Sequence, residues 1–497
     1  MESFGFGCLY WILFSLLALL PHYLFDKAYP NHPLLSYIFP IGYTMVTHSI
    51  VGNTFSTISA LSDAMLDYAP LMALASLLGV ASITFFVTLL STSAALTYAS
   101  KPYAFVVFKA TFAVMAFLMI CTGFLIQAPT MYQMDVGGLI VPQVNVSCVF
   151  ADSVEVSSNE MNEIYSQTRM RVLAGDAIVL WSEEAVFVRS DADENALLDN
   201  TRALVALTNA TSVGVTYQKQ LDGDDMGTNQ FALITPRGEI AWRYWKAHPV
   251  PLVESNIVPG ANILPTYVAD EGGALQGMKL GGAICFDMNY PSFILQAGWK
   301  KVDLLLQPSW TWGALDTRHF TGNALRAAEN GFTHFRCSSD SESGIVDPRG
   351  RIMNRIYTGH DPSVVTVFSL PLLSRVTTLY ASAGFLFEWL VLALAIVVYV
   401  LLAIPASTFD AKKAVFDPVE SWVIHAGLRL SHFTTLVYDT HSANSRLSPQ
   451  LAHSAYVTIS SGADSSRVEG DSSASSLAER EDGRTPLISS GTAGSNK

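Results

Sequence analysis

The sequence predicts a multi-pass α-helical membrane protein with an α/β domain inserted among its membrane helices. Half of the 497 residues are hydrophobic and only 14% are charged, which is too little charge for an ordinary soluble protein of this length. Five apolar stretches are close to or above the ~20 residues that cross a bilayer as a helix. Between the fourth and fifth stretches, short β-branched runs alternate with polar or helical segments, which is typical of an α/β domain.

Four of the apolar stretches fall within residues 1–130. We therefore expect four transmembrane helices there, at about residues 7–25, 34–58, 70–98 and 103–126. The second is the weakest, because Thr44, Thr47 and His48 interrupt it, and it is either an ordinary packed helix or a segment that partly lines a cavity. A cleavable signal peptide is a poor interpretation of the first stretch, which lacks a basic N-terminal region and is followed directly by more spans.

The α/β domain is predicted over residues 140–375, where the short apolar runs include AIVLW, FALI, LGGAIC and VDLLL. A final transmembrane helix is expected at residues 383–404, and residues 405–441 form a juxtamembrane segment. The tail over residues 442–497 is rich in Ser, Gly, Asp and Glu and has almost no aromatic residues, so it cannot bury enough apolar area to offset its chain entropy. We expect this tail to be disordered.

Basic residues predict which side of the membrane each part occupies. In the first 135 residues they flank the two connections on the tail's side, and they are Lys27, Lys101 and Lys109. Two more, Lys412 and Lys413, follow the last predicted helix. The positive-inside rule therefore places the tail in the cytosol and the α/β domain on the non-cytosolic side, which is lumenal, periplasmic or extracellular. N-glycosylation sequons at Asn145 and Asn209 fit this placement, although two sequons can arise by chance.

Charge and cysteine content argue against two classes of function. The formal net charge of −13, without any cluster of Lys and Arg, argues against a nucleic-acid partner. The five cysteines form no CxxC or His-rich pattern, so neither a zinc site nor a disulfide scaffold is indicated. The sequence leaves open whether Cys148 and Cys337 pair with each other.

Three segments of the domain carry the groups that nucleophilic acyl chemistry needs, namely a nucleophile, a base and a cation for the oxyanion. KLGGAICFDMNYP leads an apolar strand into Cys285 at a predicted sharp turn. AIVLWSEEAV places Glu183 and Glu184 at the end of another strand, where a carboxylate costs free energy unless it is paired or functional. WRYWKAHPVPLVE places Lys246 after a third strand, with Glu254 eight residues further on. A lone buried cysteine is more often structural, so it is the three segments together that favour catalysis.

These segments, in this order, resemble the carbon-nitrogen hydrolase (nitrilase) superfamily. WSEEA resembles the W-P-E-T-A segment of the family, and KAHPVPLVE is similar to the K-x-H-L-V-P-F-x-E of one branch, the apolipoprotein N-acyltransferases. QPSWTWG resembles the N-D-A-W-F-G of that branch, NALRAAENG its R-A-x-E, and TLYASAGFLFEW the stretch that opens its last membrane helix. Asp287 stands where the branch usually has Glu, the N-terminal membrane part is shorter, and the Ser-rich tail is foreign to it. The chain thus resembles a divergent member, fungal-like or otherwise eukaryotic.

The resemblance implies a nitrilase α-β-β-α sandwich and a role for each group. Glu183 would be the base and Cys285 the nucleophile, which forms a thioester acyl-enzyme. Lys246 and the backbone N–H of Phe286 would form the oxyanion hole, and Glu254 would hold the ammonium. Neither a metal nor an organic cofactor is needed. Three aromatic residues are candidates either for a lid that binds the substrate or for core packing: Trp310, Trp312 and Phe320.

Membrane helices on both sides of the domain would bring its active site toward the bilayer, which favours a lipid acyl donor. The resemblance implies an acyltransferase that moves a phospholipid acyl group to an amine acceptor, which is a lipoprotein in the resembled branch. One alternative is a membrane-tethered amidase that uses the same groups and passes the acyl group to water. Another is a non-catalytic membrane scaffold, which the complete Glu-Lys-Cys set disfavours. Because flanking helices restrict sheet-extending dimers, we expect a monomer.

Overall fold

The computed structural model describes residues 37–52, 69–98, 102–131, 141–221, 225–270, 273–311, 316–359, 361 and 363–402. All of them lie in the first of two compact units, which spans residues 1–423, and the second unit spans residues 424–497. The predicted helix at residues 7–25, the juxtamembrane segment at residues 405–441 and the tail at residues 442–497 lie outside the described residues.

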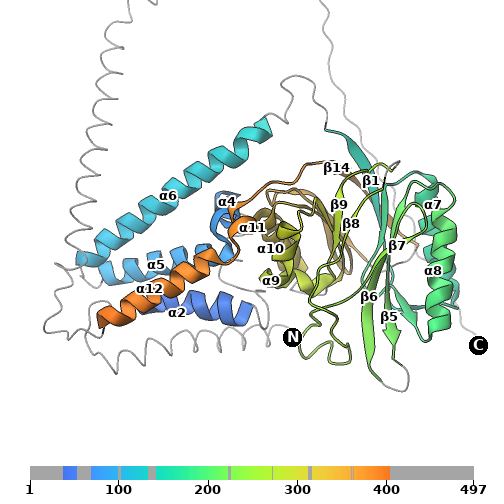
Figure 1. The fold of residues 1–497 in the computed structure, drawn as a ribbon, viewed down its shortest axis with the longest axis horizontal. Helices are drawn as coiled ribbons and strands as arrows, with labels where there is room; N and C mark the ends of the chain where they lie inside the picture. The colour runs from blue at the N-terminus through green and yellow to red at the C-terminus, as the bar shows by residue number, and fades with distance from the viewer. Residues whose placement is uncertain are drawn as a thin grey trace, which may run out of the picture. The chain divides into compact units, whose positions relative to one another are not determined.

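Apolar helices precede and follow the α/β domain along the chain (Figure 1). They are α2 (Ile38–Thr44), the π-helix η2 (Met45–Val51), α4 (Ala69–Leu78), α5 (Val80–Tyr98) and α6 (Pro102–Met131) before it, and α11 (Leu379–Ala383) and α12 (Leu386–Leu402) after it. Within the described residues, one helix, α5, is long and apolar enough to cross a membrane, and the apolar segments 104–118 and 386–397 are shorter. A multi-pass architecture therefore stays a prediction.

The α/β domain contains two sheets. The eight-stranded sheet has the order β14-β1-β3-β5-β4-β2, with β6 beside β5 and β7 beside β6, and the six-stranded sheet has the order β13-β12-β11-β10-β9-β8. The strands of the first sheet are β1 (Gln143–Val149), β2 (Val154–Glu155), β3 (Ile178–Trp181), β4 (Val186–Val188), β5 (Ser212–Gln220), β6 (Gly227–Ile234), β7 (Ile240–Trp245) and β14 (Val365–Pro371). Those of the second are β8 (Thr266–Val268), β9 (Lys279–Gly282), β10 (Leu304–Trp310), β11 (Thr333–Ser339), β12 (Ser341–Val346) and β13 (Ile352–Thr358).

Alternating side chains along the strands build two hydrophobic cores. Cys148 and Leu180 belong to the core between the sheets, whereas their neighbours Val149 and Trp181 belong to the core beneath α7 and α8. On the other side, α9 and α10 cover the second sheet (Figure 1). The helices of the domain are α7 (Asn159–Leu173), α8 (Asp191–Val205), α9 (Pro291–Trp299) and α10 (Asp316–Asn330). The layers follow the order α-β-β-α, so the predicted sandwich is confirmed.

A disulfide joins the two sheets. Cys148 on β1 is bonded to Cys337 on β11, with Cα atoms 5.3 Å apart and a sequence separation of 189. The two cysteines therefore pair, which settles the question that the sequence leaves open. Cys148 pairs across the sheet with Leu180 of β3, and Cys337 pairs with Pro308 of β10. The disulfide strands β1 and β11 thus lie next to β3, which leads to Glu183, and β10, which ends at Trp310.

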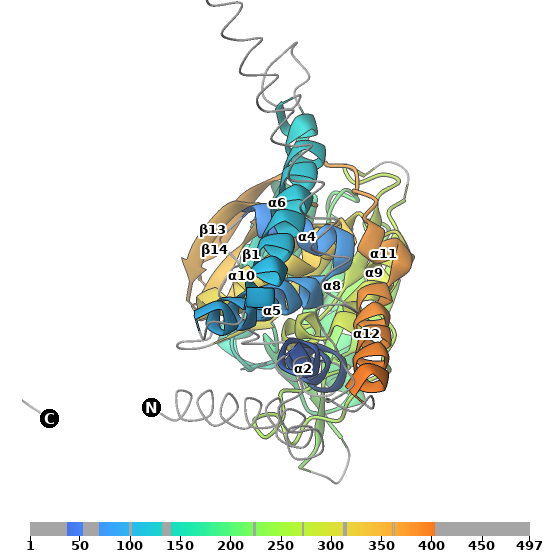
Figure 2. The same cartoon turned by 90° about the vertical axis from the view of Figure 1, so that its left-hand side faces the viewer.

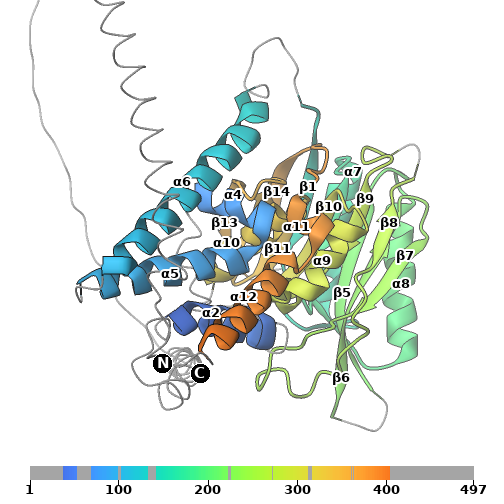
Figure 3. The same cartoon turned by 60° about the vertical axis from the view of Figure 1, so that its left-hand side comes forward.

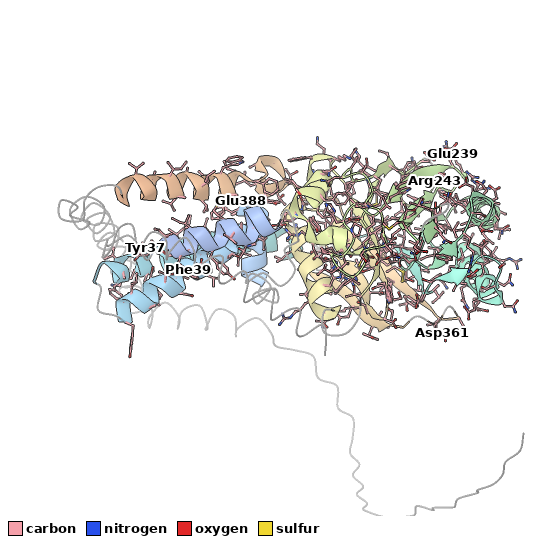
Figure 4. The ribbon with its side chains drawn as sticks, turned by 90° about the horizontal axis from the view of Figure 1, so that it is seen from below. Tyr37, Phe39, Glu239, Arg243, Asp361 and Glu388 are labelled. Carbon is pink, nitrogen blue, oxygen red and sulfur yellow. A yellow bond between two sulfur atoms is a disulfide. The ribbon has the colours of Figure 1, made fainter. Side chains whose placement is uncertain are left out.

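Packed contacts connect the apolar helices with the α/β domain. Gly79 separates α4 from α5 with φ +75°, and a Cβ atom there would come within 2.5 Å of the Tyr380 ring. The first N–H of α5, on Val80, donates to the buried carboxylate of Glu329 on α10 at 2.7 Å. Helix α12 packs against α2 and α5 (Figure 2), and α11 packs against α4 and α9 (Figure 3). Glu388, between α12 and α2 in Figure 4, lies in the first turn of α12, where the helix dipole favours an acid.

Candidate active site

Glu183 lies two residues beyond the end of β3 and is 3% exposed. Its Oε1 atom accepts hydrogen bonds from Lys246 Nζ at 2.7 Å and from Asn229 Nδ2 at 2.9 Å. Its Oε2 atom accepts the backbone N–H of Trp310 at 2.8 Å. Burial raises the pKa of Glu183 against the opposing effect of the Lys246 ammonium, which makes this carboxylate a stronger base than an exposed one.

Lys246 follows β7 directly and is 1% exposed. Its Nζ atom donates to Glu183 and, at 2.7 and 2.8 Å, to both carboxylate oxygens of Glu254. Burial on its own would lower the pKa of Lys246, but the charges of Glu183 and Glu254 raise it well above the ordinary value. The side chain is therefore an ammonium at any working pH. Glu254 is held in turn by the backbone N–H of Val250.

Cys285 opens a short 3-10 helix three residues beyond β9, and it is the free cysteine of the described residues. Its φ of +40° is rare for a residue other than glycine and fits the sharp turn that the sequence predicts. The Sγ atom lies 3.3 Å from the carbonyl oxygen of Trp310. Burial and the Glu183 charge raise the pKa of Cys285 to about 12, so the resting group is a thiol that needs a base.

Asp287 anchors the turn that carries Cys285. Its Oδ2 atom accepts the Tyr244 hydroxyl at 2.7 Å and the backbone N–H of Ile284 at 3.0 Å. Its Oδ1 atom accepts the backbone N–H of His248, two residues after Lys246, at 2.9 Å. One carboxylate thus ties the Cys285 turn to the segment that carries Lys246.

The three aromatic residues proposed for a lid have different positions. Trp310 contacts the site mainly through its backbone, which donates to Glu183 and accepts from the Cys285 thiol. Its indole N–H is 3.4 Å from Asp340. Phe320 is fully buried in the core, as the packing alternative expects. Trp312 lies outside the described residues.

Sequence reasoning missed two side chains that touch the site. Asn229 on β6 donates to the Glu183 carboxylate, and Tyr244 on β7 donates to Asp287. Both are internal strand residues, so no turn or motif marks them in the sequence. Asp287 carries a weak signal, because it follows the nucleophile by two residues at a position where the resembled branch also has an acid.

Part of the chain is similar to a known family of enzymes. Residues 151–366 match the family model of the carbon-nitrogen hydrolases. The chain is 27% identical over 201 residues to an apolipoprotein N-acyltransferase of Rickettsia prowazekii (strain Madrid E), covering 36% of this chain and 39% of that protein. It is 28% identical over 164 residues to a deaminated glutathione amidase of Dictyostelium discoideum, covering 29% of this chain and 54% of that protein. The chain therefore matches less than two thirds of the length of either relative.

Among solved structures, the chain is similar to an amidase from Nesterenkonia sp., with a TM-score of 0.39, 17% identity, and coverage of 47% of this chain and 93% of that one. A variant of the Nesterenkonia AN1 amidase, described as a member of the nitrilase superfamily, gives a TM-score of 0.41 and 16% identity. It covers 50% of this chain and 96% of the other.

Proposed function

Residues 151–366 belong to the carbon-nitrogen hydrolase (nitrilase) superfamily, and from this premise we propose that the protein is a membrane-embedded acyltransferase. It moves an acyl group from a phospholipid, through a thioester on Cys285, to an amine acceptor such as a lipoprotein. The observation that carries the proposal is the position of Lys246 between Glu183 and Glu254, in a site that also holds the free thiol of Cys285. The likeness to apolipoprotein N-acyltransferases favours transfer from a lipid.

In the first half of the reaction, Glu183 takes the proton of the Cys285 thiol, and the thiolate attacks the ester carbonyl of the phospholipid. The Lys246 ammonium and the backbone N–H of Phe286 stabilise the oxyanion, and loss of one such donor typically costs about 100- to 1,000-fold in rate. The C–O bond then breaks, and Glu183 returns its proton to the departing lysophospholipid oxygen. The product is a thioester on Cys285.

In the second half, the nitrogen of the amine acceptor attacks the thioester carbonyl, and the same oxyanion hole serves again. Glu183 removes the proton that the nitrogen loses and passes it to the sulfur of Cys285 as the C–S bond breaks. An amide leaves and the thiol is restored. The raised pKa of Glu183 suits a group that alternates between base and acid.

We place the catalytic domain on the non-cytosolic side of a membrane, with a cytosolic tail and a monomeric chain. The apolar helix α5 and the distribution of lysines support the membrane placement. The disulfide between Cys148 and Cys337 supports placement of the domain on the non-cytosolic side, because cytosolic thiols are kept reduced. Asn209 is exposed in a turn after α8, where an oligosaccharide could attach without disturbing the fold.

The second candidate function is amide hydrolysis. The match to deaminated glutathione amidase favours it, because that relative is named for the cleavage of an amide. The same three groups perform this reaction if water replaces the amine in the second half. The two functions therefore share the acyl-enzyme and differ in what removes the acyl group.

Intact mass spectrometry of the purified protein after incubation with phospholipid tests the proposal. Wild type is compared with Cys285→Ala, and free fatty acid and acylated amine are measured in the same samples. A hydroxylamine-sensitive mass increase of one acyl group in wild type alone, followed by an acyl amide when an amine is added, is the expected result. Release of free fatty acid alone would show that the acyl group passes to water and would favour the hydrolase, and no adduct with any phospholipid would overturn the transferase.

A further inference from the structure

Glu184, the residue after the catalytic base, is a buried acid that the reaction described above does not use. Its backbone has φ +50°, a left-handed conformation that is strained for a residue with a side chain, and its carbonyl accepts the N–H of Ser153 at 2.9 Å. The side chain is half-buried, and one of its two carboxylate oxygens, Oε1, is buried. Within the described residues, its Oε1 atom is shielded from water and has no hydrogen-bond partner. Such a group is costly unless a ligand satisfies it.

The charges around Glu184 are unbalanced. The carboxylates of Glu183, Glu254 and Asp152 raise its pKa, and the Lys246 ammonium opposes them. The Lys246 ammonium already donates to Glu183 and Glu254. Burial and the Glu183 charge together raise the pKa of Glu184 to about 8. Acidic groups therefore outnumber the cation that acts on Glu184, and a cation that came close to it would be attracted.

We propose that Glu184 binds the ammonium group of the amine acceptor and so selects charged amines over neutral nucleophiles. This inference rests on the proposed function, because it names the group that recognises the second substrate. The carboxylate is a feature of this chain, since the resembled W-P-E-T-A segment has threonine at the same position. An ion pair with a buried carboxylate is also much stronger than a hydrogen bond to a threonine hydroxyl.

The bound ammonium must lose a proton before its nitrogen can attack, and in this proposal the Glu184 carboxylate takes it. The carboxylate and the ammonium become a neutral acid and a free amine. The nitrogen then bonds to the thioester carbon, Glu183 removes the second proton, and the C–S bond breaks to give the amide. Glu183 protonates the sulfur of Cys285, and Glu184 releases its proton to solvent, so atoms and charges balance.

The test measures how two nucleophiles deacylate the same acyl-enzyme. The full-length protein is acylated with p-nitrophenyl butyrate at pH 9, where the Glu184 carboxylate is ionised. The rate of acyl loss is followed with octylamine, which is still protonated at this pH, and with hydroxylamine, which is not. Glu184→Gln keeps the size of the side chain and removes its charge, and Glu184→Thr installs the residue of the resembled segment. Glu155→Gln is the matched control, because Glu155 is an exposed acid paired with Arg189 on the same sheet.

We expect the ratio of the octylamine rate constant to the hydroxylamine rate constant to fall about 10- to 100-fold in both Glu184 variants, mainly through a higher KM for octylamine. The control should keep the wild-type ratio. An unchanged ratio, or an equal loss with both nucleophiles, would overturn the inference. Failure of phospholipid to acylate the wild type would overturn the proposed function instead, because the butyryl group in this test comes from an activated ester.

Discussion

Lys246 Nζ lies 2.7 and 2.8 Å from the two carboxylate oxygens of Glu254 and 2.7 Å from the Oε1 atom of Glu183. One ammonium is thus shared between two carboxylates, of which we propose that Glu183 is the base and Glu254 the support. Glu254 thus fixes the direction in which Lys246 can donate to an oxyanion.

Glu254→Gln should slow formation of the acyl-enzyme about 10- to 100-fold, because charge-assisted hydrogen bonds contribute ~1.5–3 kcal/mol. The single-turnover rate of acylation measures this, with Glu155→Gln as a control for the loss of a carboxylate elsewhere on the sheet. An acylation rate like that of wild type would show that Lys246 does not depend on Glu254.

The pH dependence of acylation should report on Glu183. The rate should fall as pH drops through the pKa of Glu183, because only the carboxylate can accept the thiol proton. Burial raises this pKa above 4.5, and the Glu254 charge adds to the rise. Removal of that charge in Glu254→Gln should therefore move the acid limb of the pH–rate profile to lower pH. A limb that moves to higher pH would contradict the assignment of Glu183 as the base.

Asp287 should act by positioning rather than by contact with the substrate. Asp287→Ala removes the bonds from Tyr244 and His248, so the Cys285 turn loses its anchor. We expect kcat to fall about 10- to 100-fold with little change in KM, since two or three hydrogen bonds to a charged group are lost. Asp287→Glu should restore most of the activity, because the resembled branch has Glu at this position. Equal activity of both variants would argue against the positioning role.

Much of the site could be predicted from the sequence because its charged groups follow apolar strands. Glu183, Lys246 and Cys285 each lie within three residues of a strand end, and the structure brings all three to one edge of the two sheets. A charged residue that follows an apolar run can be identified from the sequence alone. The α-β-β-α order also follows from strand and helix patterns combined with the family resemblance.

Contacts made inside strands could not be predicted in the same way. Asn229 lies beside Lys246 because β6 pairs with β7, with Gln230 opposite Trp245, and from there its side chain donates to Glu183. Sequence spacing says nothing of that register. The role of Trp310 was also hidden, because its backbone, not its indole ring, contacts Glu183 and Cys285.

The pairing of Cys148 with Cys337 could not be predicted from the sequence, because the distance between the two residues depends on how the two sheets pack. We expect this disulfide to stabilise the domain. Cys148→Ser combined with Cys337→Ser should destabilise the domain by about 2–5 kcal/mol, because removal of a native disulfide releases a long loop in the unfolded chain. Thermal unfolding measures the loss. Thiol labelling of the denatured wild type with and without reductant is the control, and equal labelling would show that the bond is absent.

Glu184 should make the folded protein less stable as pH rises. In the unfolded chain a glutamate ionises near pH 4.5, whereas burial and the Glu183 charge raise the pKa of Glu184 in the folded protein to about 8. Between these values the unfolded state has released a proton that the folded state keeps, so stability falls through this window and the loss is complete above it.

Glu184→Gln cannot ionise, so the variant should escape this loss. Its Tm relative to wild type should be higher at pH 8 than at pH 5, by about 2–4 °C for each kcal/mol of stability regained. Thermal unfolding at the two pH values measures the difference, and Glu155→Gln should show no such trend, because that acid is exposed. If Glu184→Gln stabilises the protein and also reduces its selectivity for charged amines, Glu184 binds the substrate at a cost in the stability of the folded state. A Tm difference that is the same at both pH values would mean that Glu184 ionises like an exposed acid and is not held for a cation.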